Sequence, residues 1–422
     1  MSLEDFRADA LRCTRCAYCK WVPIDLIKSW RFSKGCPSIE FNHFHSYSAG
    51  GRYVTALSLL ENRVEVTDKL KESVFKCQMC GNCDVTCKIC RYDMEPLAAM
   101  HELRFTMVKG GHTIHEHDQV IEGYRKLNNM LKKPKDKKGD WADGLKIKDL
   151  TKETAEVVFH AGCQYSYDSE LQKVARISVE ILQNAGVDFG IMGKEENCCG
   201  GRAYHMGYKD DYNNGADRNL AAWKKAGVKT VITPCADCYH TFKRLYPQNG
   251  STIEVLHMVE FVDRLIREGK IRFTKPVNKK VTYHDPCYLG RQGEPYIPWD
   301  GKEKKIFGQA VVYDPPRPRY IGAYGVYEAP RNILKAIPGV ELIEMERIKE
   351  GAWCCGAGGG VKEAYPEFAK QTAMERIEEA QATGAEAIVS ACPWCERNFM
   401  DIEADARKME VIDILELVKQ AI

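Results

Sequence analysis

The chain has 422 residues, 44% hydrophobic and 28% charged, so it is long enough for two or three folded domains and is not expected to be disordered. Its 61 Lys and Arg residues nearly balance its 59 Asp and Glu residues, which leaves a formal net charge of +2. This balance excludes a strong overall positive charge of the kind that attracts nucleic acids or anionic membranes, and we therefore expect no nucleic-acid partner.

The start of the chain and its cysteine content indicate the compartment. The first sixteen residues, MSLEDFRADALRCTRC, lack the apolar segment of a signal peptide, and no stretch reaches the about 20 apolar residues that cross a bilayer. We therefore expect a cytoplasmic protein without direct membrane insertion. Nineteen cysteines in such a chain favour bound metal over disulfides, because a reducing cytosol keeps thiols free.

Residues 1–125 hold nine of the cysteines and are predicted to be mainly helical, since apolar residues recur at helical spacing in 52–63 and 65–75. The run Cys77-x-x-Cys80-x-x-Cys83-x-x-x-Cys87 has the spacing of bacterial ferredoxins, in which three thiolates hold one 4Fe-4S cluster and the fourth reaches across to another. A second triplet stands nearer the start of the chain. Crossed ligation therefore predicts two cubane 4Fe-4S clusters, held by Cys13, Cys16, Cys19 and Cys87, and by Cys36, Cys77, Cys80 and Cys83.

Two details depart from the ferredoxin pattern. Cys36 lies farther from its triplet than is usual, and Cys87 precedes Lys88 rather than a proline. Cys90 is therefore an alternative crossing ligand, although the spacing from Cys83 favours Cys87. Zinc is the competing interpretation because CxxC pairs also form zinc cages, but two triplets in one region exceed the needs of a single ion.

Two further segments precede the next domain. His112, His115 and His117 lie close in sequence, and we expect a polar loop or helix face there without a metal, because no cysteine or carboxylate spacing completes a site. Residues 126–155 are predicted to be a linker, and the basic stretch 132–139 within it is expected to be solvated.

The remainder of the chain is a duplication, with copies at 156–275 and 276–422. Residues 157–163 match 281–287, the Cys-Cys-Gly at 198–200 matches that at 354–356, and 231–238 match 388–395. Short β-branched runs end at cysteines, and helical patterns lie between them. Alternating strands and helices predict parallel sheets, whose ligands bind at the carboxyl ends of the strands. The expected fold class is α/β: a helical, two-cluster ferredoxin-like domain, then two tandem α/β repeats related by a pseudo-twofold axis.

Each repeat carries one cysteine, then the vicinal pair, then CxxC. This is the CCG-domain signature, and the whole chain resembles the heterodisulfide reductase family, in which a ferredoxin-type part is fused to a catalytic part with two CCG domains. The resemblance implies a non-cubane 4Fe-4S cluster in each repeat. The implied ligands are Cys163, Cys198, Cys199, Cys235 and Cys238 in the first repeat, and Cys287, Cys354, Cys355, Cys392 and Cys395 in the second.

Residues beside these cysteines suit the same chemistry. Gly200, Gly201 and Gly356 follow the vicinal pairs, where glycine permits positive φ and lets backbone N–H groups approach an anionic cluster. His160 and His284 each precede the first cysteine of a repeat by three residues. They are candidate catalytic proton donors beside the clusters, with a packing role as the alternative.

The resemblance implies an oxidoreductase subunit of a cytosolic anaerobic complex. It would relay electrons through two cubane and two non-cubane clusters, between a flavin-containing heterodisulfide-reductase-A-like subunit, ferredoxin or other redox subunit and a terminal reductase. A class II benzoyl-CoA reductase complex is one candidate. Alternatives are a disulfide reductase that cleaves an S–S substrate at the non-cubane clusters, and the iron–sulfur subunit of a glycolate, lactate or glycerol-3-phosphate oxidising complex.

The second repeat is about 30 residues longer than the first between its first cysteine and its vicinal pair. The excess lies around 292–324, a segment rich in Pro, Tyr and Gly. An insertion at the carboxyl edge of a sheet is expected to cover the site or to bind a partner.

Overall fold

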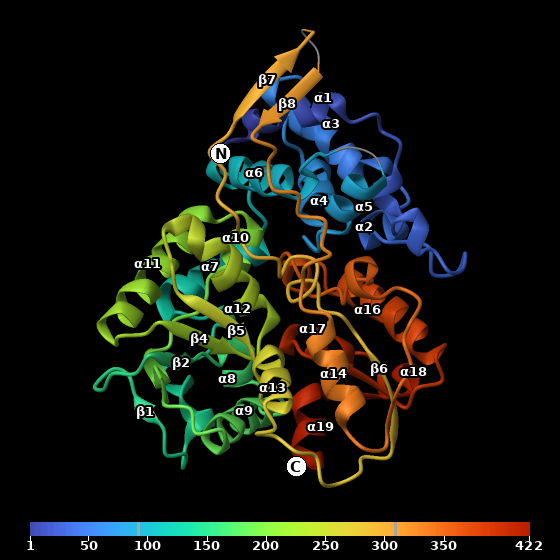
Figure 1. Cartoon of the computed structure of the whole chain (residues 1–422). Coiled ribbons are helices and arrows are strands. Elements are labelled where there is room, and N and C mark those ends of the chain that lie inside the picture. Colours follow the sequence, from blue (N-terminus) through green and yellow to red (C-terminus); the bar gives the residue numbers. More distant parts are fainter. Residues whose placement is uncertain (91–92, 308–309) are drawn as a thin grey trace.

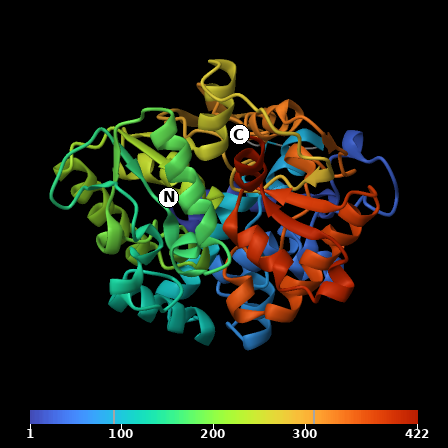
Figure 2. The same ribbon diagram turned by 90° about the horizontal axis from the view of Figure 1, so that it is seen from below.

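The computed structural model describes residues 1–90, 93–307 and 310–422. Figure 1 shows the N-terminal helices at the top of the view and two α/β units side by side below them. Seen from below in Figure 2, the C-terminus lies near the boundary between these two units. The N-terminal helices touch both units, since Arg104 donates hydrogen bonds to His205 O of the first and to Gly359 O of the second.

The N-terminal part is helical, as the apolar spacing predicts. Side chains cap two of its helices: Ser48 Oγ accepts from Gly51 N at the start of α3, and Thr67 Oγ1 accepts from Leu70 N at the start of α4. The expected helices at 52–63 and 65–75 correspond to these two. The helices are α1 (Arg7–Arg12), α2 (Pro37–Asn42), α3 (Ala49–Leu60), α4 (Asp68–Phe75), α5 (Asn82–Cys90), α6 (Pro96–Lys109) and α7 (His115–Leu127).

The first α/β unit contains a parallel sheet of order β1-β3-β2-β4-β5. Its strands are β1 (Lys148–Asp149), β2 (Val157–Phe159), β3 (Phe189–Ile191), β4 (Thr230–Thr233) and β5 (Glu254–His257). Its helices are α8 (Gly162–Tyr167), α9 (Gln172–Asn184), α10 (Gly201–Met206), α11 (Lys209–Lys225), α12 (Ala236–His240) and α13 (Met258–Arg267).

The second unit repeats this topology in a parallel sheet of order β11-β10-β6-β9, which matches β5-β4-β2-β3 strand for strand. Its strands are β6 (Lys279–Tyr283), β9 (Val340–Leu342), β10 (Ala387–Ser390) and β11 (Glu410–Asp413). Its helices are α14 (Glu328–Ala336), α15 (Val361–Ala364), α16 (Pro366–Gln381), α17 (Pro393–Met400), α18 (Ala404–Arg407) and α19 (Ile414–Ala421). The predicted duplication and parallel sheets are confirmed.

The contact between the units is reciprocal. Helix α13 of the first packs on α14 of the second, and α9 of the first packs on α19 of the second. In the repeat, α9 is equivalent to α14 and α13 is equivalent to α19, so the two contacts are the same contact made twice. Lys173 on α9 and Glu416 on α19 form an ion pair of 2.6 Å across it. This exchange is what the predicted pseudo-twofold relation requires.

The segment 126–155, predicted as a linker, is partly built into the first unit. Strand β1 pairs with β3, and Trp141 is buried with its ring edge-on to Phe159, 5.7 Å between centroids. Lys138, in the basic stretch, is also buried and forms an ion pair of 3.4 Å with Glu196. Residues 132–134, 136 and 137 are exposed as expected, but the expectation of a solvated stretch was wrong for Lys138, whose charge is paired with a buried carboxylate.

The long insertion forms a hairpin of β7 (Lys302–Ile306) and β8 (Ala310–Asp314), seen beside the N-terminal helices at the top of Figure 1. Its return strand leads to Arg317, which lies 3.7 Å from Asp9, and to Arg319, which donates to Lys88 O at 2.5 Å. The insertion therefore fastens the second repeat to the N-terminal part.

Candidate functional site

The first N-terminal cysteine set encloses a cavity. Its walls include four thiols from two distant segments and the start of α3, whose backbone N–H groups at Ala49 and Gly50 donate to the Cys19 sulfur. Burial raises the pKa of the Cys19 thiol. The cysteines that line the cavity are Cys13, Cys16, Cys19 and Cys87. Cys90, the alternative crossing ligand, is not among them.

The second N-terminal set gathers Cys36 beside the 77–83 triplet. The thiols of Cys77 and Cys80 lie near that of Cys36, whose pKa burial raises to about 12, against the opposing charge of Arg52. Cys83 lies near Cys77 and Cys80 as well, and burial raises its pKa. Cys36, although distant from these cysteines in sequence, thus lies beside the triplet with which crossed ligation groups it.

In the first repeat, the five cysteines meet at the carboxyl ends of three neighbouring strands. Cys163 follows β2, the vicinal pair follows β3, and the CxxC pair follows β4. The thiols touch in series, Cys163 with Cys198 and Cys199 with Cys238. Hydrogen bonds from the Cys198 and Cys238 thiols lower the pKa of Cys199 to about 6 despite its burial.

Glycine is needed at two places in this set. Gly200 has φ of +84°, which turns the chain so that Gly201 N–H donates to the Cys199 sulfur. Gly162 has φ of +79°, and a Cβ there would lie 3.0 Å from Cys238 Sγ. Both positions bring the backbone close to a cysteine sulfur, and Gly162 was not singled out from the sequence.

The second repeat gathers its five cysteines in the same way after β6, β9 and β10. Cys354 touches Cys287 and Cys355, and Cys355 touches Cys395. Gly356 has φ of +95° and its N–H donates to Cys354 Sγ at 3.3 Å.

Two thiol contacts join the sets in series. Cys80 of the N-terminal part touches Cys354 of the second repeat, and the hydrogen bond from the Cys354 thiol lowers the pKa of Cys80 to about 6. Cys235 of the first repeat touches Cys392 of the second. These last two cysteines are equivalent in the repeat, so their contact lies on the pseudo-twofold axis. The two thiol contacts therefore connect the N-terminal part to the second repeat, and the second repeat to the first.

Sequence reasoning missed the polar residues between the two repeats. Arg202, Asp237 and Tyr288 are all buried there, and the Arg202 guanidinium stacks 3.9 Å over the Trp394 ring. Burial raises the pKa of Asp237 to about 7, although the charge of Arg202 opposes this shift. Asp237 Oδ1 and the Tyr288 hydroxyl have no hydrogen-bond partner within the described ranges. The feature of the sequence that could have identified Asp237 is its position between the two cysteines of the CxxC pair.

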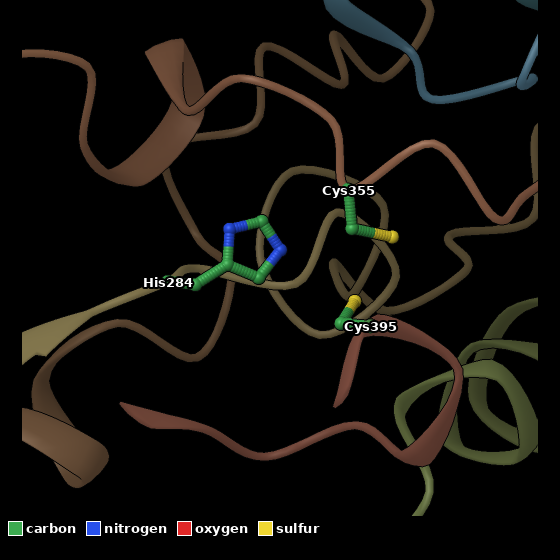
Figure 3. A group of neighbouring side chains, drawn as sticks. All are labelled: His284, Cys355 and Cys395. Atoms are coloured by element: carbon green, nitrogen blue, oxygen red, sulfur yellow. The ribbon is translucent and has the colours of Figure 1, made fainter. Parts of the chain in front are cut away.

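The two candidate histidines are buried but differ in surroundings. His284 lies beside Cys355 and Cys395, and Figure 3 shows one ring nitrogen pointing toward these sulfurs. His160 lies edge-on to Trp223 and Phe242, and burial lowers its pKa to about 4. A further buried cation, Lys138, has its Nζ 3.6 Å from Cys163 Sγ and could not be found from spacing.

The histidines at 112, 115 and 117 do not share one environment. His117 is buried with Nε2 2.8 Å from Gly360 O, whereas His112 and His115 are not buried. His117 therefore belongs to the contact between α7 and the second repeat rather than to a polar face.

The residues present fit iron–sulfur clusters. Within the part of the chain that the structure describes, the cysteines form no disulfide, and many of their thiols touch. Sets of four fit cubane clusters, and sets of five with vicinal pairs exceed the four ligands of a structural zinc ion. Backbone N–H groups directed at Cys19, Cys199 and Cys354 supply the hydrogen bonds that such anionic groups require.

Comparison with known families assigns the same parts of the chain. A 4Fe-4S dicluster domain matches residues 9–89, and a Cysteine-rich domain, CCG, matches residues 157–243 and 318–400. The second CCG match begins within the insertion and so omits Cys287. Among the described residues, no helix combines the length and apolar character that a bilayer crossing needs.

Several known sequences are similar over most of the chain. One subunit of the dihydromethanophenazine:CoB--CoM heterodisulfide reductase of Methanosarcina mazei is 32% identical, over 97% of this chain and 93% of its own length. Probable iron-sulfur-binding oxidoreductase FadF of Bacillus subtilis is 28% identical over 100% of this chain and 61% of its own. EtfAB:quinone oxidoreductase of Syntrophomonas wolfei is 29% identical over 81% and 46%.

Proposed function

The chain belongs to the heterodisulfide reductase family of iron–sulfur oxidoreductases, and we propose that it relays electrons from its N-terminal part to paired centres in its two CCG repeats. The proposal assigns two cubane clusters to the N-terminal sets and two non-cubane clusters to the five-cysteine sets. The clusters supply one-electron chemistry when bound, and the protein's residues fix their positions and environment.

The contact between Cys80 and Cys354 carries this proposal. It joins the second N-terminal set to the second repeat, while the contact between Cys235 and Cys392 joins the second repeat to the first. Electrons entering through the N-terminal part would therefore reach the second repeat before the first.

A second candidate, disulfide reduction, is favoured by the contact on the pseudo-twofold axis. A disulfide bound beside the contact of Cys235 with Cys392 would lie next to both five-cysteine sets. Its S–S bond takes two electrons from the relay and two protons from the surroundings, giving two thiols. The buried carboxyl of Asp237, with its raised pKa, holds a proton beside the axis, and the nearby Arg202 is paired with Glu363.

The proposed donor is a flavin-containing heterodisulfide-reductase-A-like subunit, a ferredoxin or another redox subunit. A redox partner is supported by two relatives named above, one a subunit of a heterodisulfide reductase and the other an EtfAB:quinone oxidoreductase. Membership of a benzoyl-CoA reductase complex, an anaerobic source and a cytoplasmic location stay predictions.

Cluster content tests the first part of the proposal. Protein purified without oxygen should contain about 16 iron atoms per chain, four for each of four clusters, and little zinc. Stoichiometric zinc with trace iron would contradict it.

The order of the relay is tested with equivalent substitutions in the two repeats. After Cys355→Ala, stopped-flow reduction by a low-potential donor should still reach the N-terminal clusters but should be slow at the first repeat. After Cys199→Ala, the second repeat should still be reduced at the wild-type rate. Equal effects of the two substitutions would refute the order. Thiol release from a small organic disulfide would support the second candidate, and its absence in fully loaded protein would favour the relay alone.

A further inference from the structure

His284 occupies a position that resembles a metal-ligand site. It follows β6, its side chain is buried, and one of its ring nitrogens, Cys355 Sγ and Cys395 Sγ all lie within 4.8 Å of one another. Figure 3 shows the nitrogen farther from the backbone, Nε2, directed toward the two sulfurs. Geometry alone would therefore allow His284 either to bind iron or to donate a hydrogen bond.

Arg376 on α16 decides between these roles. Its Nε lies 3.1 Å from His284 Nδ1, and an arginine side chain can only donate hydrogen bonds. Nδ1 must therefore be the acceptor, so the single proton of the neutral ring resides on Nε2. Glu379 holds the guanidinium in place through an Nη1 to Oε2 hydrogen bond of 2.7 Å. The tautomer is fixed by these two buried contacts.

We propose that His284 Nε2–H is a hydrogen-bond donor to a sulfur of the cluster in the second repeat and is not a metal ligand. The proposal rests on the function proposed above, since it requires a cluster in that cysteine set. A protonated Nε2 has no lone pair for iron, and its N–H points at the sulfurs. The positive end of this N–H dipole favours the more negatively charged, reduced cluster, so it should raise the reduction potential.

The equivalent histidine of the first repeat has no such arrangement. His160 lies 3.7 Å from Glu196 and edge-on to Trp223 and Phe242, and its Nδ1, unlike that of His284, has no hydrogen-bond partner in the part of the chain that the structure describes. The arginine-fixed donor thus distinguishes the second repeat from the first. Two clusters with equivalent cysteine ligands should therefore differ in potential.

Spectroscopy of the wild-type protein gives the first test. In protein labelled with ¹⁵N-histidine, pulsed EPR of the reduced second-repeat cluster should show a weakly coupled nitrogen and a nearby proton that exchanges in D₂O. A strong coupling, characteristic of a nitrogen bound directly to iron, would overturn the proposal. Absence of any cluster signal from the second repeat would instead refute the proposed function.

Substitutions give the second test. His284→Leu should leave the iron content unchanged and shift the potential of one CCG-repeat cluster downward, and His284→Gln, which retains an N–H donor, should restore part of the shift. His160→Leu, the matched control, should leave that potential unchanged. Loss of about four iron atoms per chain in both His284 variants would show that His284 is an iron ligand. An unchanged reduction potential in a His284→Leu variant with its full iron content would show that His284 donates no hydrogen bond to the cluster.

Discussion

Arg104 is expected to be the residue on which the junction of the three parts depends most. It is fully buried on α6, and its guanidinium donates to five carbonyl oxygens. They belong to Val74, Phe75 and Cys77 of the N-terminal part, to His205 of the first repeat and to Gly359 of the second, at 2.6 to 3.1 Å. Burial lowers its pKa to about 10, so it stays charged at neutral pH.

We expect Arg104→Met to destabilise the protein substantially. A hydrogen bond from a charged donor contributes about 1.5–3 kcal/mol, and carbonyls left buried without a donor add a desolvation cost. The guanidinium itself costs free energy to bury, which offsets part of this gain. An acceptor left buried without a donor costs about 1–3 kcal/mol, so two or more such carbonyls among the five give an expected loss of about 4 kcal/mol.

Anaerobic guanidinium unfolding, with midpoint and slope measured, checks this value. Arg125→Gln is the control, because Arg125 is exposed and pairs with Asp211 on the surface, where an ion pair contributes about 0–1 kcal/mol. A change below about 1 kcal/mol for Arg104→Met would show that the five bonds are not what holds the parts together. Reduction of the second repeat should also slow, because Arg104 bonds Cys77 O and Gly359 O together.

Three other changes give distinct outcomes. Cys87→Ser should lose one cubane EPR signal and Cys90→Ser should lose none, and the opposite result would transfer the crossing role to Cys90. Trp141→Ala should cost about 3–5 kcal/mol of unfolding free energy, whereas Trp30→Ala, at an exposed position, should stay within about 0.5 kcal/mol by the same denaturation assay. Burial lowers the pKa of His117 to about 4 from an unfolded value near 6.5, so the unfolded chain binds the proton first and stability falls as the pH drops from 6.5 to 4. His117→Gln should therefore lose less stability over that window, by on the order of 3 kcal/mol, and equal acid sensitivity of both proteins would contradict the role of His117.

The cysteine sets and the duplication could be predicted from the sequence because both depend on spacing. Ligands of one cluster come from short motifs, and a parallel strand that ends at a cysteine places it at a known edge of the sheet. The same argument placed Gly200 and Gly356, where positive φ is required. Local sequence patterns therefore predict most residues of the candidate site.

The residues that spacing did not reveal act between distant segments. Lys138 was expected in solvent but lies on Cys163, because a buried glutamate and the sheet hold it there. His117 was expected on a polar face but packs against Gly360. Arg376 gives His284 its orientation from 92 residues away. Each depends on how the three parts pack, which no periodicity in the chain encodes.

That packing breaks the symmetry of the duplication. Two equivalent five-cysteine sets related by a twofold axis would by themselves give electrons equal access to both. The N-terminal part touches one set by sulfur, at Cys354, whereas the equivalent Cys198 donates its backbone N–H to Asn128 O. The asymmetric contact at Cys354 and the symmetric contact of Cys235 with Cys392 together give the proposed relay an order, which is N-terminal part, second repeat, first repeat.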